Sequence, residues 1–154
     1  MFSHTASVAW TLGEGEDFVR GRYSRAHAVA FDSGTVVPGS ASPLVVPKPW
    51  SVESAVDPEE MLVAALSSCH MLSFLHVARE ADFVVTAYRD EAEGVMEKTA
   101  DGGWWVARVI LRPAIVYAGP APDAAAAEAL HHAAHETCFI ANSVKTEVTV
   151  EPRP

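Results

Sequence analysis

The chain has 154 residues, of which 49% are hydrophobic, and its formal net charge is −9. This composition predicts one ordered globular domain over residues 1–154 and excludes an intrinsically disordered chain. The negative charge, with 11 Lys and Arg scattered along the sequence, argues against binding to nucleic acid or to an anionic membrane surface.

The N-terminal part is expected to be β structure. Residues 3–12 alternate between two sets of side chains, as a half-buried strand does. A glycine-rich turn at residues 13–17 follows, and residues 26–31 are the second expected strand. A third strand at residues 35–37 is possible but short.

Residues 38–56 are expected to form a long loop, because they contain four prolines. Loops of this length are usually functional or disordered. The loop also carries several apolar side chains, namely Leu44, Val45, Val46 and Trp50. We therefore expect it to pack onto the protein rather than to link two domains.

A central helix is predicted from Asp57 to about residue 78. Asp57 can cap its free N–H groups, and Glu59 and Glu60 place negative charge at the positive end of the helix dipole. The remainder is apolar nearly all round, which is typical of a helix inside a core. Cys69, one of two cysteines in the chain, lies in the middle of this helix.

The C-terminal half is predicted to hold two long strands, a helix and a last strand. Residues 83–97 and 104–117 have strand-like patterns and are separated by a polar hairpin loop at residues 98–103. A helix is predicted over residues 124–137, and a strand over residues 143–151. The order β–β–loop–α–β–β–α–β indicates an α+β fold built from antiparallel hairpins.

Two cysteines are too few for a disulfide framework, so they indicate chemistry or packing. If the two helices pack side by side, Cys138 can come within disulfide distance of Cys69. The C-terminal end of the second helix is expected to leave Cys138 partly open, whereas Cys69 is expected to be enclosed. A buried thiol needs a nearby cation to react, and Arg22 or Arg25 could supply it.

Each of these residues also has a structural interpretation. A lone cysteine in an apolar helix is commonly a core residue. The two arginines can be solvated surface residues, and Glu59 can be a helix-dipole charge. From spacing alone, the chain is an α+β domain with two thiols.

Three segments resemble the OsmC/Ohr family. Residues 58–69 resemble its proline–glutamate and cysteine signature, residues 135–138 its second cysteine segment, and residues 21–26 its arginine segment. The resemblance implies an OsmC-like α+β fold in which antiparallel sheets pack around two central helices of an intertwined homodimer. It also implies a thiol-dependent peroxidase that reduces organic and inorganic hydroperoxides in the defence against oxidative stress.

The resemblance assigns four catalytic positions. Cys69 matches the cysteine that attacks the peroxide and Cys138 the one that resolves the product, while Glu59 matches the glutamate of the signature. Arg22 is our choice for the functional arginine, with Arg25 in reserve. No metal, flavin or haem is implied, and an external dithiol of the lipoyl or thioredoxin type would be the reductant.

The sequence also departs from the family pattern. Phe139 stands where many members have proline after the second cysteine, and Ser68 and His70 replace the alanine and aromatic residue that usually flank the first. The change around the first cysteine is expected to alter the preference for peroxides.

Helix geometry argues for a site built from more than one helix. Ten residues separate Glu59 from Cys69, which is about 15 Å along a helix axis and roughly 80° around it. To act together they need a bent helix, a bridging arginine, or a carboxylate from a second subunit. Two antiparallel copies of the apolar helix would form a plausible dimer centre.

Two other functions compete with this one. His131, His135 and Cys138 fall on one helical face, with His132 adjacent and His70 beside the first cysteine, and zinc accepts such ligands. Alternatively, the protein binds a small apolar ligand in a dimer cleft without turnover.

A soluble, cytoplasmic protein is expected. We find no basic-then-apolar N-terminal signal and expect no uncharged stretch of about 18 apolar residues.

Overall fold

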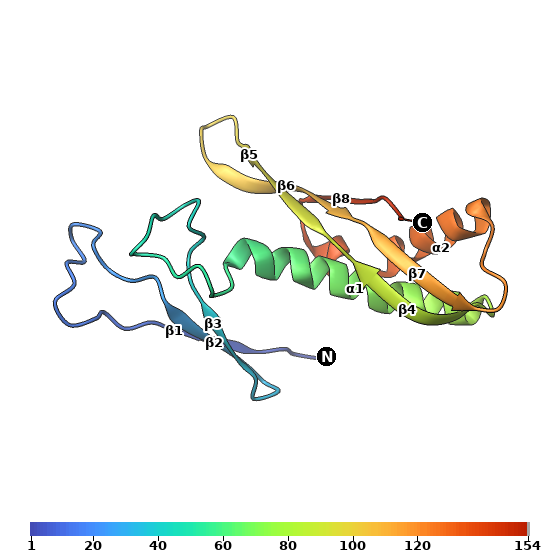
Figure 1. The fold of residues 1–154 in the computed structure, drawn as a ribbon, viewed down its shortest axis with the longest axis horizontal. Helices are drawn as coiled ribbons and strands as arrows, with labels where there is room; N and C mark the ends of the chain where they lie inside the picture. Colours follow the sequence, from blue (N-terminus) through green and yellow to red (C-terminus); the bar gives the residue numbers. More distant parts are fainter. Residues whose placement is uncertain (154) are drawn as a thin grey trace. The chain divides into compact units, whose positions relative to one another are not determined.

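The structure is a computed structural model and describes residues 1–153. The chain divides into two compact units, Met1–Met61 and the residues from Leu62 onward. Their separate elements are shown in Figure 1. The expectation of a single domain stays a prediction.

The first unit contains a three-stranded antiparallel sheet in the order β1 (Ala6–Ala9), β2 (His27–Phe31), β3 (Val36–Gly39). The second strand is confirmed to within one residue. The first is shorter than the predicted 3–12, because β1 pairs only with residues 28–31. The third strand exists and runs two residues further than expected.

The proline-rich loop returns to the sheet it leaves. The Ser40 N–H donates to the Val56 carbonyl at 3.1 Å, and the Val56 N–H donates to the Pro38 carbonyl at 3.0 Å. Leu44 and Val45 are nevertheless 98% and 67% exposed. The expectation that these two side chains pack onto the protein is therefore wrong for the single chain.

Helix α1 spans Pro58–Glu80, close to the predicted helix. It begins with a capping box, in which Asp57 Oδ1 accepts the Glu60 N–H at 2.7 Å and Glu60 Oε2 accepts the Asp57 N–H at 3.0 Å. Its buried side chains are four residues apart: Leu66, His70, Phe74 and Ala78. Leu72, on another face, is 61% exposed. The expected burial nearly all round is thus wrong for one chain, where a single stripe is covered.

By length and composition alone, α1 is able to cross a membrane. Residues 61–78 contain no Asp, Glu, Lys or Arg, so the expectation that no such stretch exists is wrong. This is a weak indication, because core helices of soluble proteins have the same length and composition.

In the second unit, each predicted long strand is broken in two. The first gives β4 (Val84–Asp90) and β5 (Glu93–Lys98), and the second gives β6 (Trp104–Leu111) and β7 (Pro113–Ala118). β4 pairs with β7 and β5 with β6, both antiparallel, so a hairpin continues through the break.

Asp90 lies at this break and explains it. One carboxylate oxygen accepts the Arg112 N–H at 2.6 Å, and the other accepts the Ser67 hydroxyl of α1 at 2.5 Å. These bonds draw both strands to α1 at the point where the ladder is interrupted.

Helix α2 (Ala124–Thr137) has the predicted bounds, because Asp123 Oδ1 caps it by accepting the Ala126 N–H at 2.8 Å. The last strand, β8 (Glu147–Val150), is shorter than predicted, since Ala141–Ser143 form a 3₁₀ turn, η1. β8 pairs parallel with β6, unlike the antiparallel hairpins.

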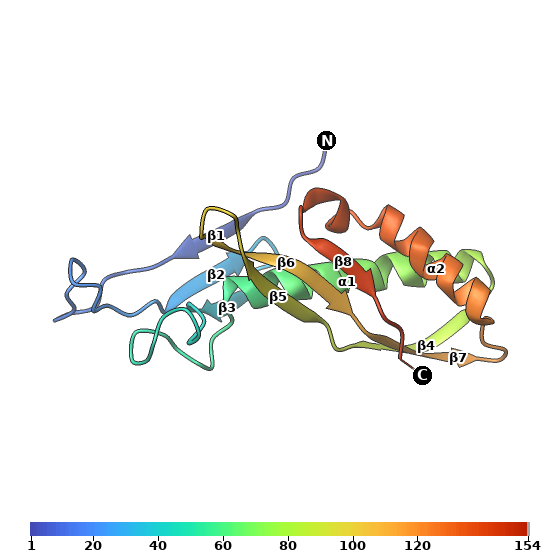
Figure 2. The same ribbon diagram turned by 90° about the horizontal axis from the view of Figure 1, so that it is seen from above.

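The core of the second unit lies between its helices and strands. Figures 1 and 2 both show α2 beside the C-terminal part of α1. Phe74 and Ala78 of α1 pack there against Leu130 and Ala134 of α2. A second cluster joins Leu66 to the strands. Because α1 and α2 share a core, residues on their facing sides are held together.

Candidate redox site

The two thiols meet where α1 passes the end of α2. Cys69 lies on α1, and Cys138 is the C-cap residue of α2. The Cys69 side chain lies close enough to that of Cys138 to raise the pKa of its thiol. The Ile140 N–H donates to Cys69 Sγ at 3.5 Å, and the Ala141 N–H donates to Cys138 Sγ at 3.4 Å. Both cysteines are free thiols, and because adjacent N–H groups contact their sulfurs, the two side chains lie close together; their catalytic roles stay a prediction.

The two sulfurs differ in access, and in the opposite sense to our expectation. Cys138 is 1% exposed, whereas Cys69 is partly exposed. Burial raises the pKa of the Cys138 thiol, and the neighbouring Cys69 side chain raises it further, while the Ala141 and Ile140 N–H groups lower it. A solute therefore reaches Cys69 first, and Cys138 is held as a neutral thiol.

A pair of buried histidines joins the same two helices. His70 Nε2 and His131 Nδ1 are 3.2 Å apart, and the rings are nearly parallel, with centroids 5.5 Å apart. Burial lowers the pKa of both; that of His70 falls to about 4, with added repulsion from His131 and His135. Sequence reasoning missed this pair, although His70 lies four residues from both Leu66 and Phe74 on the buried stripe.

The histidine-rich face of α2 does not form a metal site. Within residues 1–153, no group of three or more His, Cys, Asp and Glu side chains is arranged to hold a metal ion. His131 faces His70, Cys138 faces Cys69, and the exposed His132 lies 3.8 Å from Glu136. The predicted zinc alternative therefore has no assembled ligand set in the part of the chain that is described.

The two candidate arginines lie in the first unit and differ in how they are held. Arg22 is bonded to Asp17 through the main chain, and its side chain is exposed. The half-buried Arg25 places its guanidinium 3.7 Å from the centre of the Tyr23 ring and donates to the Gly21 carbonyl at 3.0 Å. Arg25 is thus already engaged within its own unit.

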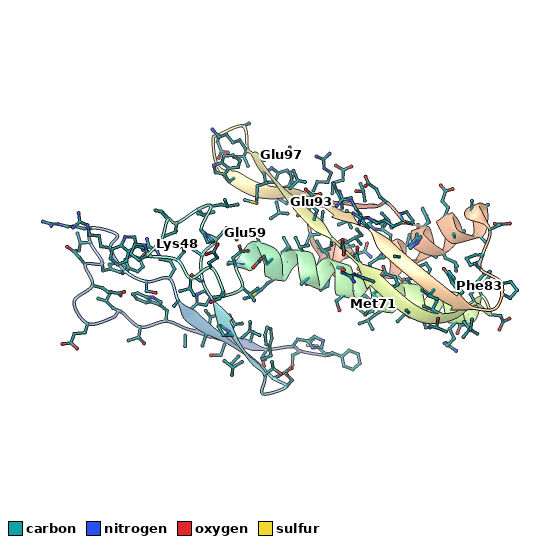
Figure 3. The ribbon with its side chains drawn as sticks, in the orientation of Figure 1. Lys48, Glu59, Met71, Phe83, Glu93 and Glu97 are labelled. Carbon is teal, nitrogen blue, oxygen red and sulfur yellow. The ribbon has the colours of Figure 1, made fainter. Side chains whose placement is uncertain are left out.

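Glu59 occupies the first turn of α1 and is half-buried, as Figure 3 shows with its label at the start of that helix. Met71, also labelled there, lies two residues beyond Cys69. The partnership of Glu59 with an arginine stays a prediction.

A protein-family model described as OsmC-like protein matches residues 51–153. The chain belongs to the OsmC-like family. The structure of an OsmC-like protein of unknown function from Vibrio cholerae is 49% identical, with a TM-score of 0.94 over 99% of this chain and 100% of that one. The predicted α+β, OsmC-like fold is confirmed.

More distant OsmC-like structures share the fold at low identity. An organic hydroperoxide resistance protein from Elizabethkingia anophelis is 18% identical, with a TM-score of 0.72 over 99% of this chain and 94% of that one. The organic hydroperoxide resistance protein OhrB of Bacillus subtilis is 20% identical, with a TM-score of 0.70 over 99% and 98%. No curated protein sequence matches this chain. At these identities the likeness establishes the fold alone.

Proposed function

We propose that this OsmC-like protein is a thiol-dependent hydroperoxide reductase that serves in the defence against oxidative stress. The observation that carries the proposal is the neighbouring pair of free thiols, one partly exposed and one buried, whose sulfurs accept from the adjacent N–H groups of Ile140 and Ala141. Membership of a family that includes organic hydroperoxide resistance proteins supports the same chemistry.

The reaction needs only the two sulfurs and an external dithiol. The Cys69 thiolate attacks one peroxide oxygen, the O–O bond breaks, and an alcohol or water leaves with a proton, so that Cys69 becomes a sulfenic acid. The Cys138 sulfur then attacks the Cys69 sulfur, and the sulfenic hydroxyl leaves as water with the Cys138 proton. A lipoyl-type or thioredoxin-type dithiol reduces the resulting disulfide by exchange. Neither metal, flavin nor haem takes part in these steps.

Arg22 is proposed to hold the charge of the attacking thiolate, with Glu59 orienting the guanidinium through a bidentate pair. The engagement of Arg25 with Tyr23 favours Arg22 for this role. The alternative assignment to Arg25 is kept for the experiment to decide.

Replacing Arg22 by alanine is expected to slow the reaction with an organic hydroperoxide by about 10- to 100-fold, the kinetic equivalent of one charge-assisted hydrogen bond. Stopped-flow measurement of peroxide consumption by the reduced protein gives the rate. Arg20→Ala is the matched control, because Arg20 is exposed and pairs only loosely with Asp17, at 3.5 Å. A larger loss in Arg25→Ala than in Arg22→Ala would move the role to Arg25.

The working unit is proposed to be a cytoplasmic homodimer. The first unit leaves large apolar side chains uncovered on its sheet and turn: Val8, Trp10, Leu12, Phe18, Phe31 and Val36. Leu72 is likewise uncovered on α1. Apolar surface of this extent favours a partner, and a second copy that pairs its α1 antiparallel with this one would satisfy the symmetry of a closed dimer.

A further inference from the structure

The buried histidine pair lies beside the thiols on both helices. His70 follows Cys69 directly on α1, and His131 precedes Cys138 by seven residues, or about two helical turns, on α2. Its surroundings are apolar: the His131 ring centroid is 4.5 Å from that of Phe74. The two helices therefore meet at two neighbouring levels, through the hydrogen-bonded imidazoles and through the adjacent thiols.

Packing alone does not explain a polar pair at this place. Within residues 1–153, the Nδ1 atom of His70 is buried without a hydrogen-bond partner. Bulk water cannot supply that partner, because His70 is only 1% exposed. An unsatisfied polar atom is costly, whereas apolar side chains at both positions would fill the same space without that cost. Unlike two apolar side chains, an imidazole pair depends on the distance and angle between its two bonded nitrogens. The hydrogen bond therefore forms only when α2 has one particular position and rotation against α1.

We propose that His70 and His131 are positioning residues for the resolving step, since their hydrogen bond sets the register of α2 against α1 at which the Cys138 sulfur meets the Cys69 sulfur. In the neutral pair one ring nitrogen donates its N–H and the other accepts. Because the pKa of each imidazole is lowered, both rings stay neutral at neutral pH, and a single proton lies between the two bonded nitrogens. The role in peroxide reduction rests on the proposed function, but the positioning itself is measurable without any peroxide.

The measurement is the equilibrium constant for closing the Cys69–Cys138 disulfide with glutathione at neutral pH. In this reaction the protein dithiol and one glutathione disulfide give the protein disulfide and two glutathione thiols, so the constant reports how well the two sulfurs are held together. Alkylation of free thiols followed by mass spectrometry reads it. Circular dichroism and urea unfolding confirm that each variant is folded.

Two double variants separate direction from packing. The apolar double variant, His70→Leu/His131→Leu, removes both polar groups and is expected to lower the constant about tenfold, the equivalent of one net hydrogen bond. The amide double variant, His70→Gln/His131→Asn, places amide groups near the two bonded nitrogens and is expected to stay within about twofold of wild type. The exposed His132, changed to Gln, is the control and should leave the constant unchanged.

A wild-type constant in the folded apolar double variant would overturn the proposal, as would a tenfold loss in the amide double variant. If the apolar double variant does not fold, His70→Gln/His131→Leu is compared with the amide double variant, and equal constants would overturn it. A protein that closes its disulfide with these differences but consumes no hydroperoxide would refute the proposed function and leave the positioning role intact.

Discussion

Replacing Cys69 by serine is expected to abolish hydroperoxide consumption, whereas replacing Cys138 by serine is expected to leave a single turnover. A serine hydroxyl at position 69 cannot act as the thiolate does, so the first oxidation step is lost. Without Cys138 the sulfenic acid at Cys69 has no partner within the chain, and further peroxide adds oxygen to give sulfinic acid. Peroxide loss with an excess of a dithiol, together with the intact mass of the protein, measures both outcomes.

The matched control for this pair is His76→Gln, because His76 is exposed and lies seven residues beyond Cys69 on α1. It should consume peroxide at the wild-type rate. Equal multiple-turnover activity in Cys69→Ser and Cys138→Ser would contradict the assigned roles. Binding of an apolar compound without any turnover in the wild type would instead favour the ligand-binding alternative.

Acid is expected to destabilise the protein through the histidine pair. The ordinary pKa of His70 is 6.5, and burial lowers it to about 4 in the folded protein. As the pH falls below about 6.5, the unfolded chain binds a proton that the folded protein does not bind until about pH 4. The free energy of unfolding is therefore highest above about pH 6.5, and it falls by about 3 kcal/mol in total as the pH is lowered to about 4. Urea unfolding across this range measures the loss.

The groups that act on His70 are His131 and His135 of α2, and each adds repulsion when protonated. On the strand side, the ring of Phe74 lies between His70 and Tyr88 of β4 along the buried face of α1. Burial and the neighbouring Asp90 raise the pKa of Tyr88. The amide double variant His70→Gln/His131→Asn does not titrate here, so its stability should fall less over the same range. Parallel loss in wild type and variant would contradict the attribution to this pair.

Local signals predicted the helices well, because their ends are set by nearby residues. Asp123 caps α2 and Asp57 forms a capping box with Glu60, and both patterns can be read from adjacent positions. The break between β4 and β5 could not be found in this way. It depends on Asp90, which bonds residues 22 positions after it and 23 before it in the chain. The parallel pairing of β8 with β6 is likewise a property of the assembled sheet.

The candidate site was predictable in part. The proximity of Cys69 and Cys138 follows once two apolar helices are assumed to pack side by side. Which sulfur is open does not follow, because a helix apolar nearly all round gives no sign of the face that the strands cover. In the sequence His70 is a departure beside Cys69 and a possible ligand, but its partner His131 lies 61 residues away. Only the packing of α2 on α1 brings the two imidazoles together.

The most direct test of the account is a peptide mass spectrum of the reduced protein after mild treatment with one equivalent of an organic hydroperoxide. We predict a bond between the Cys69 and Cys138 peptides of one chain, formed as the peroxide disappears and reversed by a dithiol. Peroxide that disappears while both cysteines remain free thiols, or peroxide that persists beside two unchanged thiols, would contradict it.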